Sequence, residues 1–104
     1  MMSVARIYIM NAAKGRGDEL ESQLRRLTEI FSKVEGCLSV ELFRLLSDPN
    51  SFVFLHRWNS VDDHQKGLEK LDMQELTTMM SALAQIPQGQ YIDPLLSFQH
   101  MAAT

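Results

Sequence analysis

The fold of this chain is decided by the stretch Ser51-Phe52-Val53-Phe54-Leu55-His56-Arg57-Trp58-Asn59-Ser60. Most of its residues are apolar or aromatic types that favour strands, and Asp48-Pro49-Asn50 before it is a turn signal. Side chains alternate along a strand, so one face carries Phe52, Phe54, His56 and Trp58, and the other carries Val53, Leu55 and Arg57. Because both faces are largely apolar, we expect a central strand that is covered on both sides.

Length and composition indicate one ordinary globular domain over residues 1–104. The chain is 45% hydrophobic and 22% charged, with a formal net charge of -3. No basic face is present to neutralise phosphates, so we expect no nucleic-acid partner. The one cysteine, Cys37, cannot form an internal disulfide, which fits a reducing compartment. No signal-like leader or apolar run of membrane-spanning length is evident, so we expect a cytoplasmic protein with no membrane partner.

The rest of the chain predicts further strands and helices in a definite order. Strands are predicted over residues 4–10 and 37–46, and the last strand candidate covers 91–101. A first helix is predicted over 19–34, with Asp18 as its cap, and a turn over 47–50 joins two strands into a hairpin. Ser60 and Asp72 are predicted to cap a second and a third helix, because an acidic residue follows each of them three positions later.

Each predicted helix carries an apolar stripe along one face. The stripes are Leu20, Leu24, Leu27, Phe31 and Val34 in the first helix, Val61, His64, Leu68 and Leu71 in the second, and Leu76, Met79, Met80, Leu83 and Ile86 in the third. Pro87-Gln88-Gly89 is predicted to end the third helix. His64 therefore belongs to the inward face of the second helix.

This order predicts a ferredoxin-like βαββαβ sandwich of the α+β class. Its four-stranded antiparallel sheet has helices on one face and the strand order 4-1-3-2. Pro94 falls in the last strand candidate and lacks an amide donor, which suits a sheet edge or a position outside the ladder. The other sheet face, with Val53, Leu55, Ala5, Ile7 and Ile9, is left open. Since a lone domain rarely exposes such a patch, we expect a homodimer packed sheet against sheet.

The pattern resembles the antibiotic biosynthesis monooxygenase (ABM) domain family. The resemblance rests on the connection Lys14-Gly15, on Glu35-Gly36-Cys37 opening a strand, and on the stretch from Phe52 to Ser60 leading into a helix. It implies a dimeric α+β barrel of ferredoxin-like subunits. It also implies a cofactor-independent oxygenase acting on aromatic quinols or anthrones, although the family includes haem-degrading enzymes, isomerases and members without an assigned activity.

The chain departs from the family pattern at particular positions. An acidic residue commonly stands two before the tryptophan, where this chain has His56, and a histidine often stands nine after it, where this chain has Gly67. The positions that match the haem-degrading branch hold Tyr8, Gly67 and Thr77. With no axial histidine there, the resemblance does not imply haem, and we expect no cofactor.

His64 is the sharpest catalytic candidate, because burial among aliphatic residues favours a neutral imidazole that accepts protons. The alternative is a half-exposed histidine at the helix edge. Trp58 either donates its indole N–H to a ligand oxygen or caps the core. His56 shares a strand face with Phe54 and Trp58, so it either lines the same pocket or pairs with an acidic neighbour. Tyr8 reaches this space if the helices cover its face.

The histidines and the cysteine predict neither a metal site nor a reactive thiol. His56, His64 and His100 lack the spacing of metal ligands, and Cys37 resembles a small core residue.

Two hypotheses for function follow. The resemblance implies an enzyme in which His64 removes a proton from a phenol or anthrone and the carbanion reacts with oxygen, while Trp58, Tyr8 and His56 hold the substrate oxygens in an apolar pocket. The alternative is a non-catalytic dimeric binding or scaffold module whose pocket is filled by Phe54, Trp58 and Phe43.

Overall fold

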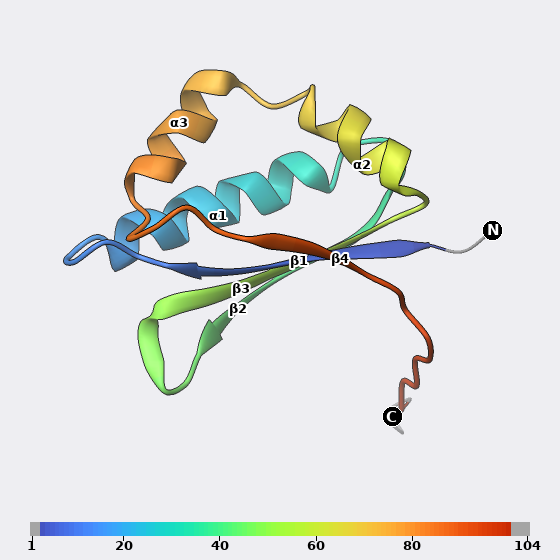
Figure 1. Ribbon diagram of the computed structural model, residues 1–104, viewed down its shortest axis with the longest axis horizontal. Coiled ribbons are helices and arrows are strands. Elements are labelled where there is room, and N and C mark those ends of the chain that lie inside the picture. Colours follow the sequence, from blue (N-terminus) through green and yellow to red (C-terminus); the bar gives the residue numbers. More distant parts are fainter. Residues whose placement is uncertain (1–2, 101–104) are drawn as a thin grey trace, which may run out of the picture.

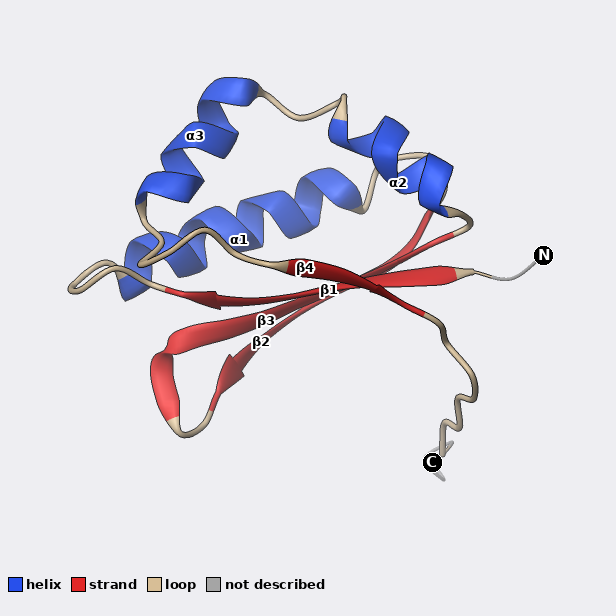
Figure 2. Ribbon diagram, in the orientation of Figure 1, coloured by secondary structure: helices blue, strands red, loops and turns tan. Residues whose placement is uncertain are grey.

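The computed structural model describes residues 3–100 and has one antiparallel sheet with helices on one side (Figures 1 and 2). The elements, in chain order, are β1 (Val4–Asn11), α1 (Gly17–Phe31), β2 (Cys37–Leu45), β3 (Asp48–Trp58), α2 (Val61–Leu68), α3 (Met73–Ser81) and β4 (Gly89–Ile92). The strand order is β2-β3-β1-β4. This confirms the predicted ferredoxin-like α+β fold, with β1 and β3 at the centre.

The helix-covered face of the sheet carries the core. In the register, Tyr8 of β1 and Leu42 of β2 both lie opposite Phe54 of β3. Phe52, Phe54 and Trp58 are each no more than 1% exposed. The predicted stripe of α1 packs onto them, with Leu20, Leu24 and Phe31 buried, and the Phe31 ring meets the Trp58 ring edge-on at 5.5 Å between centroids. Each alternate side chain of β3 is therefore sealed from water on this side.

The opposite face of the sheet has no helix over it. We call Ile7, Ile9, Phe43, Val53 and Leu55 the open face, since β1 and β2 bring the first three beside Val53 and Leu55. Ile9 is 58% exposed and Phe43 45% exposed, whereas Val53 and Leu55 are half-buried. Within the described residues, β3 is therefore covered on one side of the sheet, and the cover on both sides that the sequence predicts is not present in this chain.

The hairpin between β2 and β3 turns earlier than the sequence predicts. Leu45 pairs with Asp48, so Leu46 and Ser47 form the turn, and Pro49 lies inside β3. The register then shifts, because Arg44 already lies opposite Phe52. The extra residues on β3 form a bulge, which tolerates a proline that a regular ladder would exclude.

Two of the three predicted helix caps are present in the structure. Ser60 Oγ accepts a hydrogen bond from the Asp63 amide at 3.0 Å, and an Asp72 carboxylate oxygen accepts one from the Gln74 amide at 2.8 Å, which confirms both caps. Asp18 is not a cap, because α1 begins at Gly17 with Arg16 in the cap position. Asp18 lies in the first turn instead, where a negative charge suits the helix dipole.

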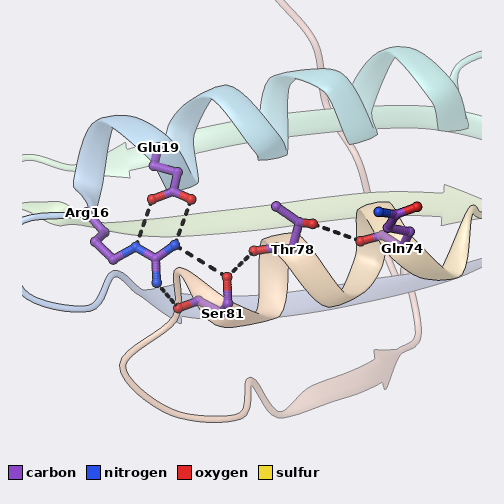
Figure 3. A network of polar contacts seen from close by, with 5 residues as sticks. All are labelled: Arg16, Glu19, Gln74, Thr78 and Ser81. Carbon is purple, nitrogen blue, oxygen red and sulfur yellow. Dashed lines mark hydrogen bonds and ion pairs between the residues drawn. The ribbon is translucent and has the colours of Figure 1, made fainter.

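The third helix is shorter than its apolar stripe predicts. It ends at Ser81, and Leu83 instead pairs with Ala12 in an isolated bridge, while Ile86 is 79% exposed. Figure 3 shows the contacts that link this end of α3 to the start of α1: the Arg16 guanidinium bonds Glu19 at 2.7 Å and donates to Ser81. Contacts with the end of β1 and the start of α1 therefore hold the chain after Ser81, in place of a further helical turn.

The last strand differs most from its prediction. Only Gly89–Ile92 pairs with β1, so the expected strand over 91–101 was wrong in extent, and Met101 lies outside the described residues. Pro94 falls beyond the edge strand, as predicted, because it has no amide to donate to the ladder. Residues 93–100 form no helix or strand, and Leu95, Leu96 and Phe98 are exposed. The predicted fraying of residues 102–104 also lies outside the described residues.

Candidate functional site

The start of α2 turns His64 toward the sheet. The Ser60 cap sets the phase of the helix, and His64 is 1% exposed. Gly67, one turn later, lies against the indole, since a Cβ there would come within 2.6 Å of the Trp58 ring. This close approach brings the His64 ring to 5.4 Å from the rings of both Trp58 and His56, measured between centroids.

An apolar cavity of about 220 Å³ lies between the sheet and the helices. Its polar lining residues are Tyr8, His56 and His64, and Phe54 contributes to the same wall. Most of the remaining wall is aliphatic or methionine side chains, from Met10, Leu27, Leu68, Leu71, Leu76, Met79, Met80 and Ile86. The structure therefore brings together Tyr8, Phe54, His56 and His64, while Phe43 lies on the open face and cannot fill this space.

Of the two roles that the sequence left open for Trp58, the structure fits the one in which the ring packs in the core. It is fully buried beside the cavity rather than lining it, and its indole Nε1–H donates to His56 Nδ1 at 2.6 Å. The N–H is thus used inside the protein instead of being offered to a ligand. Because Nδ1 accepts this bond, a neutral His56 carries its proton on Nε2.

His64 has a partner that sequence reasoning missed. Its Nδ1 lies 2.7 Å from the hydroxyl oxygen of Tyr91 on β4, and the two rings meet edge-on. Tyr91 is 39% exposed, so it lies between the buried imidazole and the solvent. In the structure, Arg6 lies opposite Tyr91, which puts Tyr91 on the same sheet face as Tyr8. The sequence could not give this register, because β4 is only 4 residues long.

Both imidazoles are neutral near pH 7. Burial, followed by the nearby His64 and Arg6, lowers the pKa of His56 to about 3. Burial and Arg6 lower the pKa of His64 to about 4. The cause is the same in each case, because an apolar enclosure beside a guanidinium disfavours a second positive charge.

His56 and His64 each have one ring nitrogen without a hydrogen-bond partner. Among residues 3–100, the buried side-chain nitrogens and oxygens without a hydrogen-bond partner are His56 Nε2 and His64 Nε2. Buried polar atoms are nearly always paired, and exceptions call for an explanation such as a bound ligand or water. Since Trp58 and Tyr91 occupy the two Nδ1 atoms, the two Nε2 atoms are the ones left for a ligand, which reaches them only when lining side chains move.

Other chemical features are sparse in the described part of the chain. Within residues 3–100, no three His, Cys, Asp or Glu side chains gather closely enough to hold a metal ion. Burial raises the pKa of the Cys37 thiol, which disfavours the reactive thiolate. None of the helices described is long and apolar enough to cross a membrane.

Comparisons with solved structures establish relatives of the fold. The Pseudomonas aeruginosa protein PA3566 has a TM-score of 0.83 and 21% identity over 92% of this chain and 97% of its own. A variant of SnoaB, a cofactor-independent oxygenase from Streptomyces nogalater, has a TM-score of 0.83 and 16% identity over 96% and 100%. A putative antibiotic biosynthesis monooxygenase from Bordetella bronchiseptica has a TM-score of 0.78 and 19% identity over 92% and 100%.

No curated protein sequence is significantly similar to this chain, so the family is identified from a sequence profile. The sequence profile described as antibiotic biosynthesis monooxygenase matches residues 2–75, which contain β1, α1, β2, β3 and α2 with Tyr8, His56, Trp58 and His64. On this match and the fold, the chain belongs to the antibiotic biosynthesis monooxygenase family.

Proposed function

We propose that this protein is a cofactor-independent monooxygenase that acts on a small aromatic quinol or anthrone in the apolar cavity, with His64 as the general base. The observation that carries the proposal is the neutral His64 imidazole on the cavity wall, with its Nε2 unpaired. Family membership supports the reaction type, as does the cofactor-independent oxygenase SnoaB among proteins of the same fold.

The size of the cavity limits the substrate. A cavity of about 150 Å³ holds benzene, and pockets for drug-sized ligands begin near about 300 Å³. The volume of about 220 Å³ here lies between them, which favours a compact substrate with few rings. Met79 and Met80 line the cavity, and their unbranched side chains adapt to ligands of different shapes.

The proposed reaction begins at His64. His64 Nε2 takes a proton from the substrate, and the carbanion forms a bond to molecular oxygen. The peroxide then loses water, so that one oxygen atom stays on the substrate as a carbonyl and the other leaves in the water. Electrons for the reduction of oxygen come from the substrate itself, and the apolar wall keeps water from the carbanion.

The alternative, a non-catalytic binding or scaffold module, has one observation in its favour. His56 and His64 are each 1% exposed, so lining side chains must move before a ligand contacts Nε2. A binding module would also explain the cavity and the unpaired nitrogens, so turnover is what separates the two functions.

The proposed assembly is a homodimer formed through the open face. Ile9 and Phe43 are large, exposed apolar residues on the same side of the sheet as Val53 and Leu55. A second copy placed face to face would cover both patches at once by two-fold symmetry.

Oxygen consumption by the purified protein tests the proposed function. We expect turnover of anthrone or quinol substrates without added metal or flavin. His64→Phe keeps the bulk of the ring and removes the proton acceptor, so the rate should fall about a hundredfold or more. Gln65→Ala is the matched control, since Gln65 is the exposed neighbour on α2. Full turnover in the His64→Phe variant would remove His64 from the mechanism, and no turnover with any substrate would favour the binding module.

A further inference from the structure

We propose that the site binds its phenol or enol as the anion, held between the two neutral imidazoles, and that Tyr91 passes the released proton to solvent. This inference rests on the proposed function in that it uses the same cavity and the same histidine. It adds the form in which the substrate is bound, a role for His56 and a route for the proton.

His56 supplies a fixed hydrogen-bond donor. The Trp58 indole N–H occupies Nδ1, which leaves the proton of the neutral ring on Nε2. That N–H is buried and unpaired. An oxygen placed beside it gains a hydrogen bond that the empty site lacks, and the bond is stronger when the oxygen is negatively charged.

His64 exchanges protons between its two nitrogens through Tyr91. With a proton on Nδ1, that N–H donates to the Tyr91 oxygen at 2.7 Å, and Nε2 is free to accept. When Nε2 takes the proton of the substrate hydroxyl, Nδ1 gives its own to the Tyr91 oxygen, and the Tyr91 hydroxyl releases its proton to water. His64 ends neutral, with Nε2–H donating to the oxyanion and Nδ1 accepting from the Tyr91 hydroxyl.

The relay removes a charge that the site disfavours. An imidazolium at His64 would be buried beside Arg6, whose guanidinium carbon is 4.3 Å from the centroid of the Tyr91 ring and whose Nε donates to the Tyr8 hydroxyl at 3.2 Å. The same positive charge that repels an imidazolium attracts a phenolate. Release of the proton to solvent therefore replaces an unfavourable His64 imidazolium with a phenolate that Arg6 stabilises.

The surrounding elements contribute no competing carboxylate to the cavity wall. The titratable and charged groups facing the pair are Arg6 and Tyr8 from β1 and Tyr91 from β4, in addition to His56 of β3 and His64 of α2. The contributions of α1 and α3 to the lining are apolar, namely Leu27, Phe31, Leu76, Met79 and Met80. Nothing in the described lining opposes a negative charge on the ligand.

Binding of 4-nitrophenol tests the anion directly, because its phenolate absorbs visible light and its single ring suits the cavity. We expect the bound phenol to ionise at a pH at least one unit below that of the free phenol. The methyl ether 4-nitroanisole, which has no proton to lose, should bind at least tenfold more weakly. Equal affinity for the ether, or bound nitrophenol that stays neutral at the pH where the free phenol ionises, would overturn the proposal.

Variants separate the donor from the relay. His56→Leu should abolish the ionisation shift, whereas His56→Gln should retain part of it, because an amide can accept from Trp58 and donate to the ligand. Tyr91→Phe should slow the appearance of phenolate in stopped-flow mixing at least tenfold, and Gln90→Ala, an exposed neighbour on β4, should leave it unchanged. An undiminished shift in His56→Leu would refute the donor, and an unchanged rate in Tyr91→Phe would refute the relay.

These measurements are independent of turnover. If the anion binds and no oxygen is consumed, the anion site stands and the oxygenase proposal fails. If oxygen is consumed and the phenol binds neutral, the reverse holds.

Discussion

The two faces of β3 show how differently one strand can be used. On the helix-covered face, Phe52, Phe54, His56 and Trp58 are each no more than 1% exposed, while on the open face Val53, Leu55 and Arg57 are half-buried. Both faces are largely apolar in sequence. Among residues 3–100, the two unpaired imidazole nitrogens belong to histidines that line the cavity on the covered face, which is why we propose that this face binds the ligand.

The contrast follows from the cost of burying polar groups. An apolar face that lacks a helix can be completed by a second copy, because apolar surface needs no specific partner. A buried imidazole without a hydrogen bond is unfavourable until something binds it. We therefore assign assembly to the open face and ligand binding to the covered one.

The largest effect is expected from a charge on the open face. Leu55→Lys should convert the proposed dimer into a monomer, because the interface would remove water from the lysine ammonium, and even a paired charge loses free energy when it is buried. Glu41 lies directly opposite Leu55 on β2, so the lysine has a partner within the monomer and the fold should persist. Light scattering at micromolar concentration measures the mass.

Val61→Lys is the matched control for this change. Val61 is an exposed apolar residue on α2, on the helix side of the sheet, and its replacement should leave a dimer. A wild-type protein that is monomeric at micromolar concentration, or a Leu55→Lys variant that remains dimeric, would contradict the assignment of the open face.

A smaller effect is expected where α2 meets the covered face. Gly67→Ala should lower the free energy of unfolding by about 1–3 kcal/mol, the usual cost of overpacking. Alanine gains about 1 kcal/mol of helix propensity over glycine, but its Cβ would come within 2.6 Å of the fully buried Trp58 ring. Denaturant unfolding measures the change. Gln65→Ala on the exposed side should be nearly neutral, and an unchanged Gly67→Ala variant would show that α2 can move away from Trp58.

The sequence predicted the elements that local patterns determine. The stripe of α1, the caps Ser60 and Asp72 and the alternation of β3 depend on neighbours close in sequence, and the structure has them. The Ser60 cap and the stripe of the second helix also indicated that His64 points inward. The strand order also followed, because the order of helices and strands along the chain is that of a ferredoxin-like sandwich.

The features that were missed depend either on side-chain rotamers or on residues far apart in sequence. The link from Trp58 to His56 required knowledge of rotamers, and the one from His64 to Tyr91 required the register of β4. The end of α3 at Ser81 is set by contacts with Ala12 and Arg16 rather than by its own apolar stripe. A stripe that looks helical can thus be divided between a helix and a bridge.

The central claim is that the covered face holds two neutral imidazoles, and nitrogen NMR of the three histidines across a pH titration tests it most directly. We expect that His56 keeps its proton on Nε2 and that neither His56 nor His64 becomes charged until the pH falls toward their pKa values of about 3 and about 4. Because these values lie below those of an unfolded chain, the native state should lose stability as the pH drops below about 6.5. A charged imidazolium at His56 or His64 near pH 7, or a His56 proton on Nδ1, would contradict the account.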